Sequence, residues 1–416
     1  MIKLLQQPKF RLLGGLYITQ ALGLSFVITA VPAIMRQNGA TLEEISVIFV
    51  LALIWVLKFL WAPFVDRYGS KKHGHYRSWL IVMQSLLIVL LVVASFFDIG
   101  SQLNILILIF AAAAFFSATQ DVAADALGVT ILLPEERGLG NSIQTSGNFI
   151  GTMIGGGIVL ITYKWLGWQP SLLVLAAATA LPLLNILRHK EQTPPVDARP
   201  QKVSHRDLVR FFKRPGILRW VAVLLTYMMG ISAANALINP MLVDLGWSLD
   251  QIGFTFNILG LGVSILGAAA AGVFMDRIGR KTAALTASLI MAISIAGLFP
   301  PATGNSNTAI IYGSICLMLF GFGIGVTVLA TMIMDKSDPD SAGTDYTLQY
   351  SMFQGTSLVL SGILLAAAET IQYSAALWIA IGFSVLGFII AYLYDGFEVV
   401  AVEPVATDAP VAISGD

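Results

Sequence analysis

Long runs of apolar residues, separated by short polar segments, fill most of the 416-residue chain. About 20 residues of helix cross the ~30 Å hydrocarbon core of a membrane, and runs of that length recur along the sequence. They predict an all-α membrane protein with twelve membrane-spanning helices. The predicted spans are residues 12–35, 45–65, 79–97, 103–125, 139–163, 171–187, 218–243, 252–275, 282–300, 308–334, 346–368 and 375–394.

The basic residues of the polar segments support this count. If the N-terminus is cytoplasmic, 21 Lys and Arg fall in cytoplasmic segments, 2 (Arg36 and Lys164) fall in outer loops, and Lys58 lies within a span. Cytoplasmic loops retain Lys and Arg far more than translocated loops do. The bias therefore predicts an even number of spans, with both termini in the cytoplasm.

Composition narrows the classes of function. Hydrophobic residues make up 56% of the chain and charged residues 12%, whereas soluble domains carry about 25% charged residues. The net charge is zero, and the four histidines lie in polar segments without the spacing of metal ligands. We therefore expect no nucleic-acid partner, no metal, no cofactor and no enzymatic activity. A bilayer and a small-molecule substrate are the expected partners, and a monomer is the expected state.

The two halves of the chain repeat each other. D-R-Y-G-S-K at 66–71 follows the second span, and D-R-I-G-R-K at 276–281 follows the eighth, 210 residues later; T-L-E-E-I at 41–45 returns as S-L-D-Q-I at 248–252. Transporters are often built from two such related bundles. The predicted organisation is an N-terminal six-helix bundle (1–187), a cytoplasmic basic linker (188–217), a C-terminal six-helix bundle (218–395) and a cytoplasmic tail (396–416).

The repeated D-R-x-G-x-K turn predicts a conformational latch. Its glycine permits an unusual backbone angle, and its Asp and Arg can pair at the helix ends. The residues of this predicted latch are Asp66, Arg67, Gly69, Asp276, Arg277 and Gly279.

Two carboxylates, Asp121 and Asp125, lie four residues apart on one face of the fourth span. Charged groups at this depth are costly and often mark a substrate or proton path, although both acids could instead brace the fold through hydrogen bonds. Lys58 lies at a depth similar to that of Asp125, so the two could pair, unless Lys58 extends toward the cytoplasm. Asp121, one turn deeper, is the predicted protonation switch.

Twelve spans in two halves, with D-R-x-G-x-K after the second and the eighth, resemble the major facilitator superfamily over the whole chain. Two blocks point to one branch of the superfamily. They are K-F-L-W-A-P-F-V-D-R-Y at 58–68, and S-A-T-Q-D at 117–121 with Asp125 and P-E-E-R-G at 134–138. They resemble the AmpG-like branch, which includes muropeptide permeases, acetyl-CoA transporters and RhtX/FptX-type siderophore importers.

Further segments favour different members of this branch. K-W-L-G-W at 164–168 is similar to the muropeptide permeases, but those carry additional charges where this chain has L-G-V at 127–129. G-H-Y-R-S-W at 74–79 and A-G-T-D-Y-T-L-Q at 342–349 look more like the siderophore importers. The resemblance thus favours proton-coupled import of a ferric siderophore across a bacterial cytoplasmic membrane, with a muropeptide or another small organic molecule as the alternative.

The resemblance also indicates where a substrate would bind. In this superfamily the first, fourth, seventh and tenth spans line the central cavity. The polar residues there are Gln20, Gln120, Asn235, Asn239 and Thr327, together with Asp121. Each could instead make a helix-packing hydrogen bond, worth about 0.6 kcal/mol on average in a membrane.

Overall fold

The computed structural model describes residues 7–70, 72–191 and 203–397, and the regular secondary structure within them is helical apart from one isolated β-bridge between Ser70 and Gly74. Some predictions lie outside these residues: Lys71 of the first turn motif, residues 192–202 of the linker and residues 398–416 of the tail. In the described part of the predicted linker, the chain forms the short helix α11 (His205–Phe211).

The first group of helices runs from Pro8 to Arg188. Its elements are α2 (Pro8–Ser25), η1 (Phe26–Ala30), α3 (Val31–Gln37), α4 (Leu42–Leu57), η2 (Lys58–Leu60), α5 (Ala62–Arg67), α6 (His75–Ala94), α7 (Leu103–Ile131), η3 (Pro134–Glu136), α8 (Arg137–Thr152), η4 (Met153–Ile158), α9 (Val159–Leu166) and α10 (Trp168–Arg188).

The second group follows α11. Its elements are α12 (Ile217–Thr226), α13 (Met229–Asp244), α14 (Leu249–Phe254), η5 (Thr255–Gly260), α15 (Leu261–Ile278), α16 (Arg280–Ala296), α17 (Phe299–Ala302), α18 (Thr308–Asp335), η6 (Pro339–Ser341) and α19 (Ala342–Leu393).

Ten helical stretches of the described chain are long and apolar enough to cross a membrane. The last of them, Pro339–Leu393, contains two helices joined at Gln372, where φ is 69°. The stretch from α4 to α5 is not among the ten, so the count of twelve stays a prediction. The predicted sixth span, 171–187, lies within the 21-residue helix α10.

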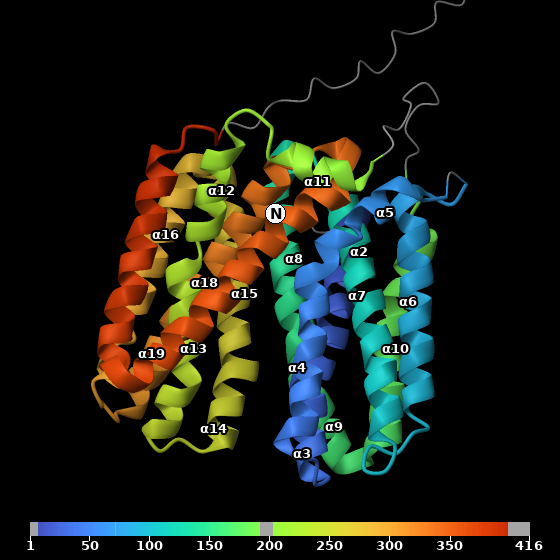
Figure 1. Ribbon diagram of the computed structural model, residues 1–416, viewed down its shortest axis with the longest axis horizontal. Helices are drawn as coiled ribbons and strands as arrows, with labels where there is room; N and C mark the ends of the chain where they lie inside the picture. Colours follow the sequence, from blue (N-terminus) through green and yellow to red (C-terminus); the bar gives the residue numbers. More distant parts are fainter. Residues whose placement is uncertain (1–6, 71, 192–202, 398–416) are drawn as a thin grey trace, which may run out of the picture.

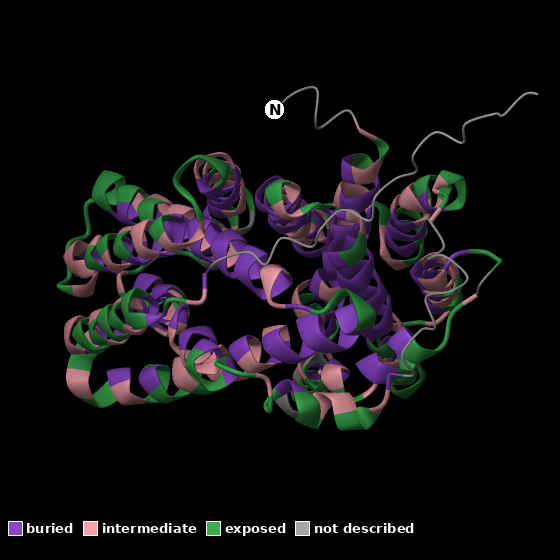
Figure 2. Cartoon of the chain, turned by 90° about the horizontal axis from the view of Figure 1, so that it is seen from above, coloured by how far each residue is buried: buried purple, intermediate pink, exposed green. Residues whose placement is uncertain are grey.

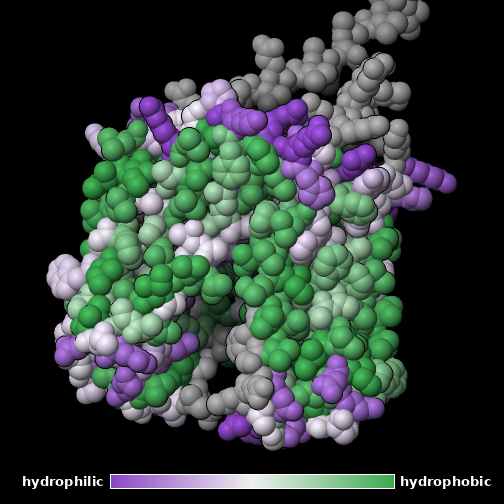
Figure 3. All heavy atoms as spheres, in the orientation of Figure 1, coloured by the Kyte–Doolittle hydropathy of each residue, from purple (hydrophilic) through white to green (hydrophobic). Residues whose placement is uncertain are grey.

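The outer surface is apolar over most of its height. Large hydrophobic side chains such as Leu108, Leu181 and Trp378 are more than half exposed, and Figure 3 shows a broad hydrophobic band with polar residues gathered at the two ends. Buried residues gather on the inner sides of the helices (Figure 2). Exposed apolar side chains on helices of both groups fit lipid, as expected for a multi-pass membrane protein.

The two groups of helices lie side by side (Figure 1). We call the end that carries α5, α11, η3 and η6 the closed end, because the two groups contact each other there. At the opposite end, which carries α3, α9 and α14, Figure 3 shows the surface hollowed between the groups. We call this the open end.

The closest contacts between helices occur at small residues. Gly147, Gly151 and Gly155 are spaced four residues apart, a pattern that lets helix backbones approach closely. A Cβ at Gly151 would overlap the carbonyl oxygen of Ile18, and one at Gly155 would overlap that of Leu22. The backbones of α2 and of the α8–η4 helix are therefore in contact. A Cβ at Gly272 would lie 2.6 Å from Cβ of Ser142, so α15 packs closely on α8 between the two groups.

Candidate functional site

Asp66, at the end of α5, joins the two groups of helices at the closed end. Its carboxylate accepts hydrogen bonds from the backbone N–H of Gly343 (3.0 Å), the N–H of Thr344 (2.7 Å) and the hydroxyl of Thr344 (2.6 Å). The first N–H groups of a helix have no partner within it, and a negative charge is favourable there. Asp66 therefore caps α19, whose preceding residue, Ser341, makes no side-chain cap.

The second copy of the motif is arranged differently. Asp276 is exposed and lies 4.0 Å from Nη1 of Arg280, while Gly138 at the start of α8 leaves room for its carboxylate, which a Cβ there would approach to 2.7 Å. Both Arg67 and Arg277 are exposed.

The two glycines of the motif serve different purposes, which the sequence did not distinguish. Gly279 has a φ of 78°, as predicted for an unusual backbone angle. Gly69 is not among the residues with positive φ, so the prediction is wrong there. A Cβ at Gly69 would instead overlap the His75 ring, so this position requires the absence of a side chain.

A second link at the closed end centres on Asp335, which the sequence analysis missed. Its carboxylate accepts hydrogen bonds from Nη1 of Arg137 (3.0 Å) and from Nε of Arg280 (2.8 Å). Arg280 also donates to the carbonyl oxygen of Pro134 (2.7 Å). Arg137 belongs to the first group of helices and Asp335 to the second, so this ion pair holds the closed end together.

A second repeat in the sequence could have revealed the helix starts that Asp66 and Asp276 contact. P-E-E-R-G at 134–138 and P-D-S-A-G at 339–343 are 205 residues apart. Each begins with a short 3₁₀ segment that leads into a long helix, η3 into α8 and η6 into α19. Asp66 of the first D-R-x-G turn lies against the start of α19, and Asp276 of the second lies against the start of α8.

The linker helix α11 also contacts both groups. Nε2 of His205 lies 2.9 Å from the carbonyl oxygen of Leu60 in the first group. Beyond the helix, Arg214 forms an ion pair with Asp345, which is fully buried in the second group. The described part of the linker therefore lies against the closed end.

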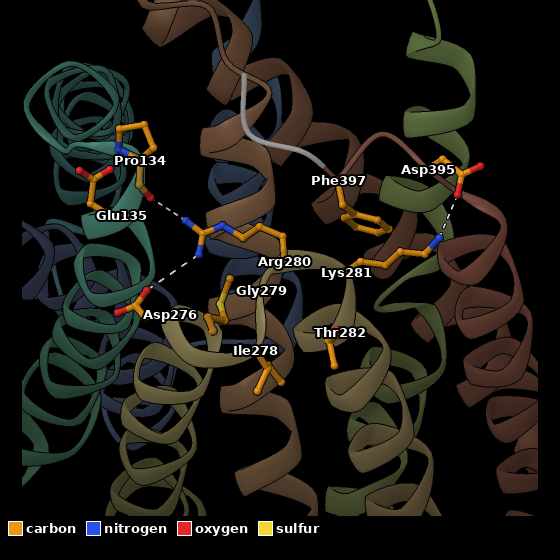
Figure 4. Close-up of a pocket in the computed structure, with 11 residues that line it drawn as sticks. Pro134, Glu135, Asp276, Ile278, Gly279, Arg280, Lys281, Thr282, Asp395 and Phe397 are labelled. Atoms are coloured by element: carbon orange, nitrogen blue, oxygen red, sulfur yellow. Dashed lines mark hydrogen bonds and ion pairs between the residues drawn. The ribbon is translucent and has the colours of Figure 1, made fainter. Parts of the chain in front are cut away.

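A groove of about 680 Å³ lies on the surface of the closed end (Figure 4). It is lined by the second D-R-x-G turn, Pro134 and Glu135, and by Lys281, whose hydrogen bond to Asp395 lowers the pKa of that exposed carboxyl. It does not include Lys58 or Asp121, and we assign it no ligand.

Deeper in the first group, Lys58 forms an ion pair with Asp121, and the Lys58 side chain is fully buried. The sequence left open a pair with Asp125 or an extension of Lys58 toward the cytoplasm, and the structure shows a pair with Asp121 instead. An unbroken helix through the second span would place Lys58 level with Asp125. The helix α4 instead ends at Leu57, and Lys58 begins the 3₁₀ turn η2. Rings from both groups surround the ammonium, with centroids 4.9 Å (Trp55) and 5.6 Å (Tyr350) from Nζ.

Asp125 is satisfied by hydrogen bonds instead. Its Oδ1 accepts from the hydroxyl of Tyr17 (2.9 Å) and from Nε2 of Gln144 (3.1 Å). The same amide nitrogen lies 3.2 Å from the hydroxyl of Tyr346 in the second group, and the Tyr346 and Tyr350 rings stack at 6.0 Å. A hydrogen-bond network thus runs from Asp125 across to the second group.

The predicted substrate-binding residues do not form one cluster. Gln120 is fully buried and donates to Gln84, which donates in turn to the carbonyl of Thr179. Gln20 is fully buried, and neither polar atom of its amide has a partner in the described chain.

The other candidates differ in their surroundings. Thr327 donates to the carbonyl of Gly323 on its own helix (2.9 Å), Asn235 has a buried Oδ1 without a partner in the described chain, and Asn239 is exposed. No described hydrogen bond joins Gln20, Asn235, Asn239 or Thr327 to the Lys58–Asp121 pair. No group of three or more His, Cys, Asp and Glu within the described residues could hold a metal ion.

The chain is similar to known sequences over most of its length. The family model described as Major Facilitator Superfamily matches residues 13–362. The chain is 27% identical to the anhydromuropeptide permease of Escherichia coli K12 over 356 residues, which cover 83% of this chain and 72% of the permease. It is 22% identical to putative transporter AmpG 4 of Rickettsia felis, over 80% of this chain and 83% of that protein.

Solved structures share the fold. The human organic anion transporter MFSD10 (TETRAN) superposes with a TM-score of 0.72 at 15% identity, covering 93% of this chain and all of that one. The proton:xylose symporter XylE gives a TM-score of 0.70 at 12% identity, covering 92% of this chain and 95% of that one.

Proposed function

Because the chain belongs to the Major Facilitator Superfamily and is a multi-pass membrane transporter, we propose that it imports an anhydromuropeptide in symport with protons. The observation that carries the substrate is the similarity to the E. coli anhydromuropeptide permease, which extends over 83% of this chain. The relatives described above give no support to the siderophore import that the sequence favoured. A siderophore is therefore the competing substrate in the test below.

The proposed substrate class suits the aromatic and amide groups that the two halves supply. An anhydromuropeptide combines sugar rings, a peptide and carboxylates, so it needs aromatic faces, amide partners and a cation. Trp55 and Tyr350 face the Lys58 ammonium from opposite groups of helices, and Gln20 and Asn235 carry buried amide atoms without partners in the described chain. We propose that these groups bind the substrate once Lys58 is freed from Asp121.

The proposed cycle is alternating access by rocking of residues 1–187 against 218–395. The structure corresponds to the state in which the closed end seals the transport path. The distribution of Lys and Arg favours a cytoplasmic closed end and cytoplasmic termini, so the open end would face outward across a bacterial inner membrane. Opening the cytoplasmic side then requires the Asp66 cap and the Arg137–Asp335 pair to separate.

Proton coupling is proposed to act at the Lys58–Asp121 pair. The two charges of an ion pair buried in a membrane stay together because burying either charge without its partner costs several kcal/mol. Protonation of Asp121 would remove one charge and leave the Lys58 ammonium to bind a substrate carboxylate. Release of both ligands to the cytoplasm would re-form the pair and reset the transporter.

The test uses the purified full chain in proteoliposomes with an imposed pH gradient, acid outside. Radiolabelled N-acetylglucosaminyl-anhydro-N-acetylmuramyl peptide should accumulate above its outside concentration and stop when a protonophore collapses the gradient. Unlabelled anhydromuropeptide should compete with uptake, and a panel of iron-loaded siderophores should not. Siderophore uptake without muropeptide uptake would reverse the substrate assignment.

Two controls make the assay specific. Liposomes without protein report leakage, and Asp121→Asn reports uptake without coupling. The variant should exchange labelled for unlabelled substrate at equal pH but should not concentrate it. Uphill uptake by Asp121→Asn at the rate of the unmodified chain would remove this residue from the proton path.

A further inference from the structure

A small cavity inside the first group of helices lies beside the buried ion pair, and of the groups assigned to the substrate above its wall contains only Trp55. Its volume is about 30 Å³, and its walls come from α2, η1, α4, α6, α7 and α10. About 10–15 Å³ of such volume holds one water molecule. The cavity therefore has room for about two water molecules and is too small for a sugar or a peptide.

Two polar groups in the cavity wall have no partner within the described chain. They are the hydroxyl of Ser117, which is 3% exposed, and the indole N–H of Trp55. Leaving such a group buried and unpaired costs about 1–3 kcal/mol. A buried water with two to four polar neighbours removes this cost, so the unpaired groups indicate water rather than an empty apolar void.

The wall of the cavity reaches the ion pair. The Trp55 ring lies 4.9 Å from Nζ of Lys58, and Ser117 precedes Asp121 by one turn of α7, so the two share a helical face. In the other direction the wall extends to Phe110, which is 11 residues, or about 16 Å of helix, nearer the open end than Asp121. The cavity wall thus lies on the open-end side of Asp121 and begins beside the pair at Trp55.

We propose that this cavity is an internal water site that delivers protons from the open end to Asp121, apart from the substrate path between the two halves. The proposal rests on the proton coupling suggested above. A hydronium ion at the open end gives a proton to the first water, each water passes on one of its own protons, and the last gives a proton to the Asp121 carboxylate. Lys58 keeps its charge, so the charge of the pair rises by one.

Water in the cavity is tested first by radiolytic labelling, which needs no substrate. Brief X-ray exposure generates hydroxyl radicals from water, and these label side chains next to internal water. Phe26 and Phe110 line the cavity and are each 1% exposed. Phe10 and Phe211, equally buried but outside the cavity wall, are the controls. Labelling of Phe26 and Phe110 should exceed that of the controls, and equal labelling would mean a dry cavity and overturn the proposal.

A filled cavity gives the second test. A Cβ at Gly23, in the cavity wall, meets no atom within 4 Å, so Gly23→Ala adds a methyl group without a clash. Gly262 on α15 has the same open surroundings and half-buried position, so Gly262→Ala is the matched control. Ser117→Ala removes a water partner without adding volume. Both Gly23→Ala and Ser117→Ala should lower labelling of Phe110, whereas Gly262→Ala should not.

Transport by the same variants decides the proton route. Gly23→Ala should lower gradient-driven uptake of labelled anhydromuropeptide about fivefold or more, as expected from the loss of one hydrogen-bonded link of about 1 kcal/mol. Its exchange at equal pH should match that of Gly262→Ala. Equal gradient-driven uptake by the two glycine variants would overturn the proton route. If the unmodified chain carries no anhydromuropeptide while labelling still follows the variants, the proposed substrate fails and the water site stands.

Discussion

The carboxylate of Asp66 accepts two hydrogen bonds from Thr344, one from its backbone N–H at 2.7 Å and one from its hydroxyl at 2.6 Å, across the two groups of helices. The residues are 278 positions apart, and Asp66 is only 8% exposed. The hydroxyl of Tyr76 donates to the same carboxylate at 2.9 Å. The contacts with Thr344 form only while the closed end is sealed, whereas the contact with Tyr76 lies within the first group of helices.

Asp66→Asn should weaken the seal and lower transport while membrane insertion stays normal. Hydrogen bonds to a charged acceptor contribute about 1.5–3 kcal/mol each, so the loss of the charge should shift the open–closed equilibrium about tenfold or more. Spin labels at the exposed positions Tyr68 and Asp340 should report a larger share of long distances. Asp276→Asn is the control, because that side chain is exposed and 4.0 Å from Arg280. Equal effects of both variants would contradict a special role for Asp66.

Asp335→Asn should destabilise the folded chain more than Arg137→Gln. The first change leaves the guanidinium groups of Arg137 and Arg280 without their carboxylate, whereas the second leaves Asp335 bonded to Arg280. Breaking a buried pair costs about 3–5 kcal/mol. Lys281→Gln breaks the exposed contact with Asp395, worth about 0–1 kcal/mol. Melting of the purified protein should follow this order, and a Lys281→Gln effect as large as that of Asp335→Asn would refute it.

Double variants should identify the partner of Lys58. Lys58→Met leaves the Asp121 carboxylate buried alone, and Asp121→Asn leaves the Lys58 ammonium alone, so each should lower the yield of folded protein. Their combination should recover much of the loss, because no charge is then buried unpaired. Lys58→Met with Asp125→Asn should give no such recovery. Recovery in the second combination would favour the pairing that the sequence suggested and the structure replaces.

Gly151→Ala should lower the melting temperature, because a Cβ at this position overlaps the carbonyl oxygen of Ile18 and forces α2 and α8 apart. Overpacking of a tight contact typically costs about 1–3 kcal/mol. Gly313→Ala, on α18 with no atom within 4 Å of the added methyl group, is the matched control. A Gly151→Ala protein as stable as this control would show that the helices tolerate separation.

The sequence predicted best what depends on local pattern. Apolar length located the helices, and the repeated D-R-x-G pointed to Asp66 as a residue of the closed end. It failed where geometry depends on helix rotation: the break at Lys58–Leu60 turns the lysine toward Asp121. It also missed Asp335, because the two arginines that define its role lie 198 and 55 residues away.

Helix α19 is not capped by its own N-cap residue, Ser341, and depends on Asp66 of the first group for its cap. The amides of Gly343 and Thr344 donate to Asp66, which belongs to the first group of helices. Unbonded helix-end amides exchange with solvent deuterium readily, whereas bonded ones are protected. These two amides should therefore exchange slowly when the closed end is sealed and quickly when it parts. Deuterium uptake by the peptide that contains them would follow the transport cycle in the unmodified protein, with no engineered cysteine or spectroscopic label.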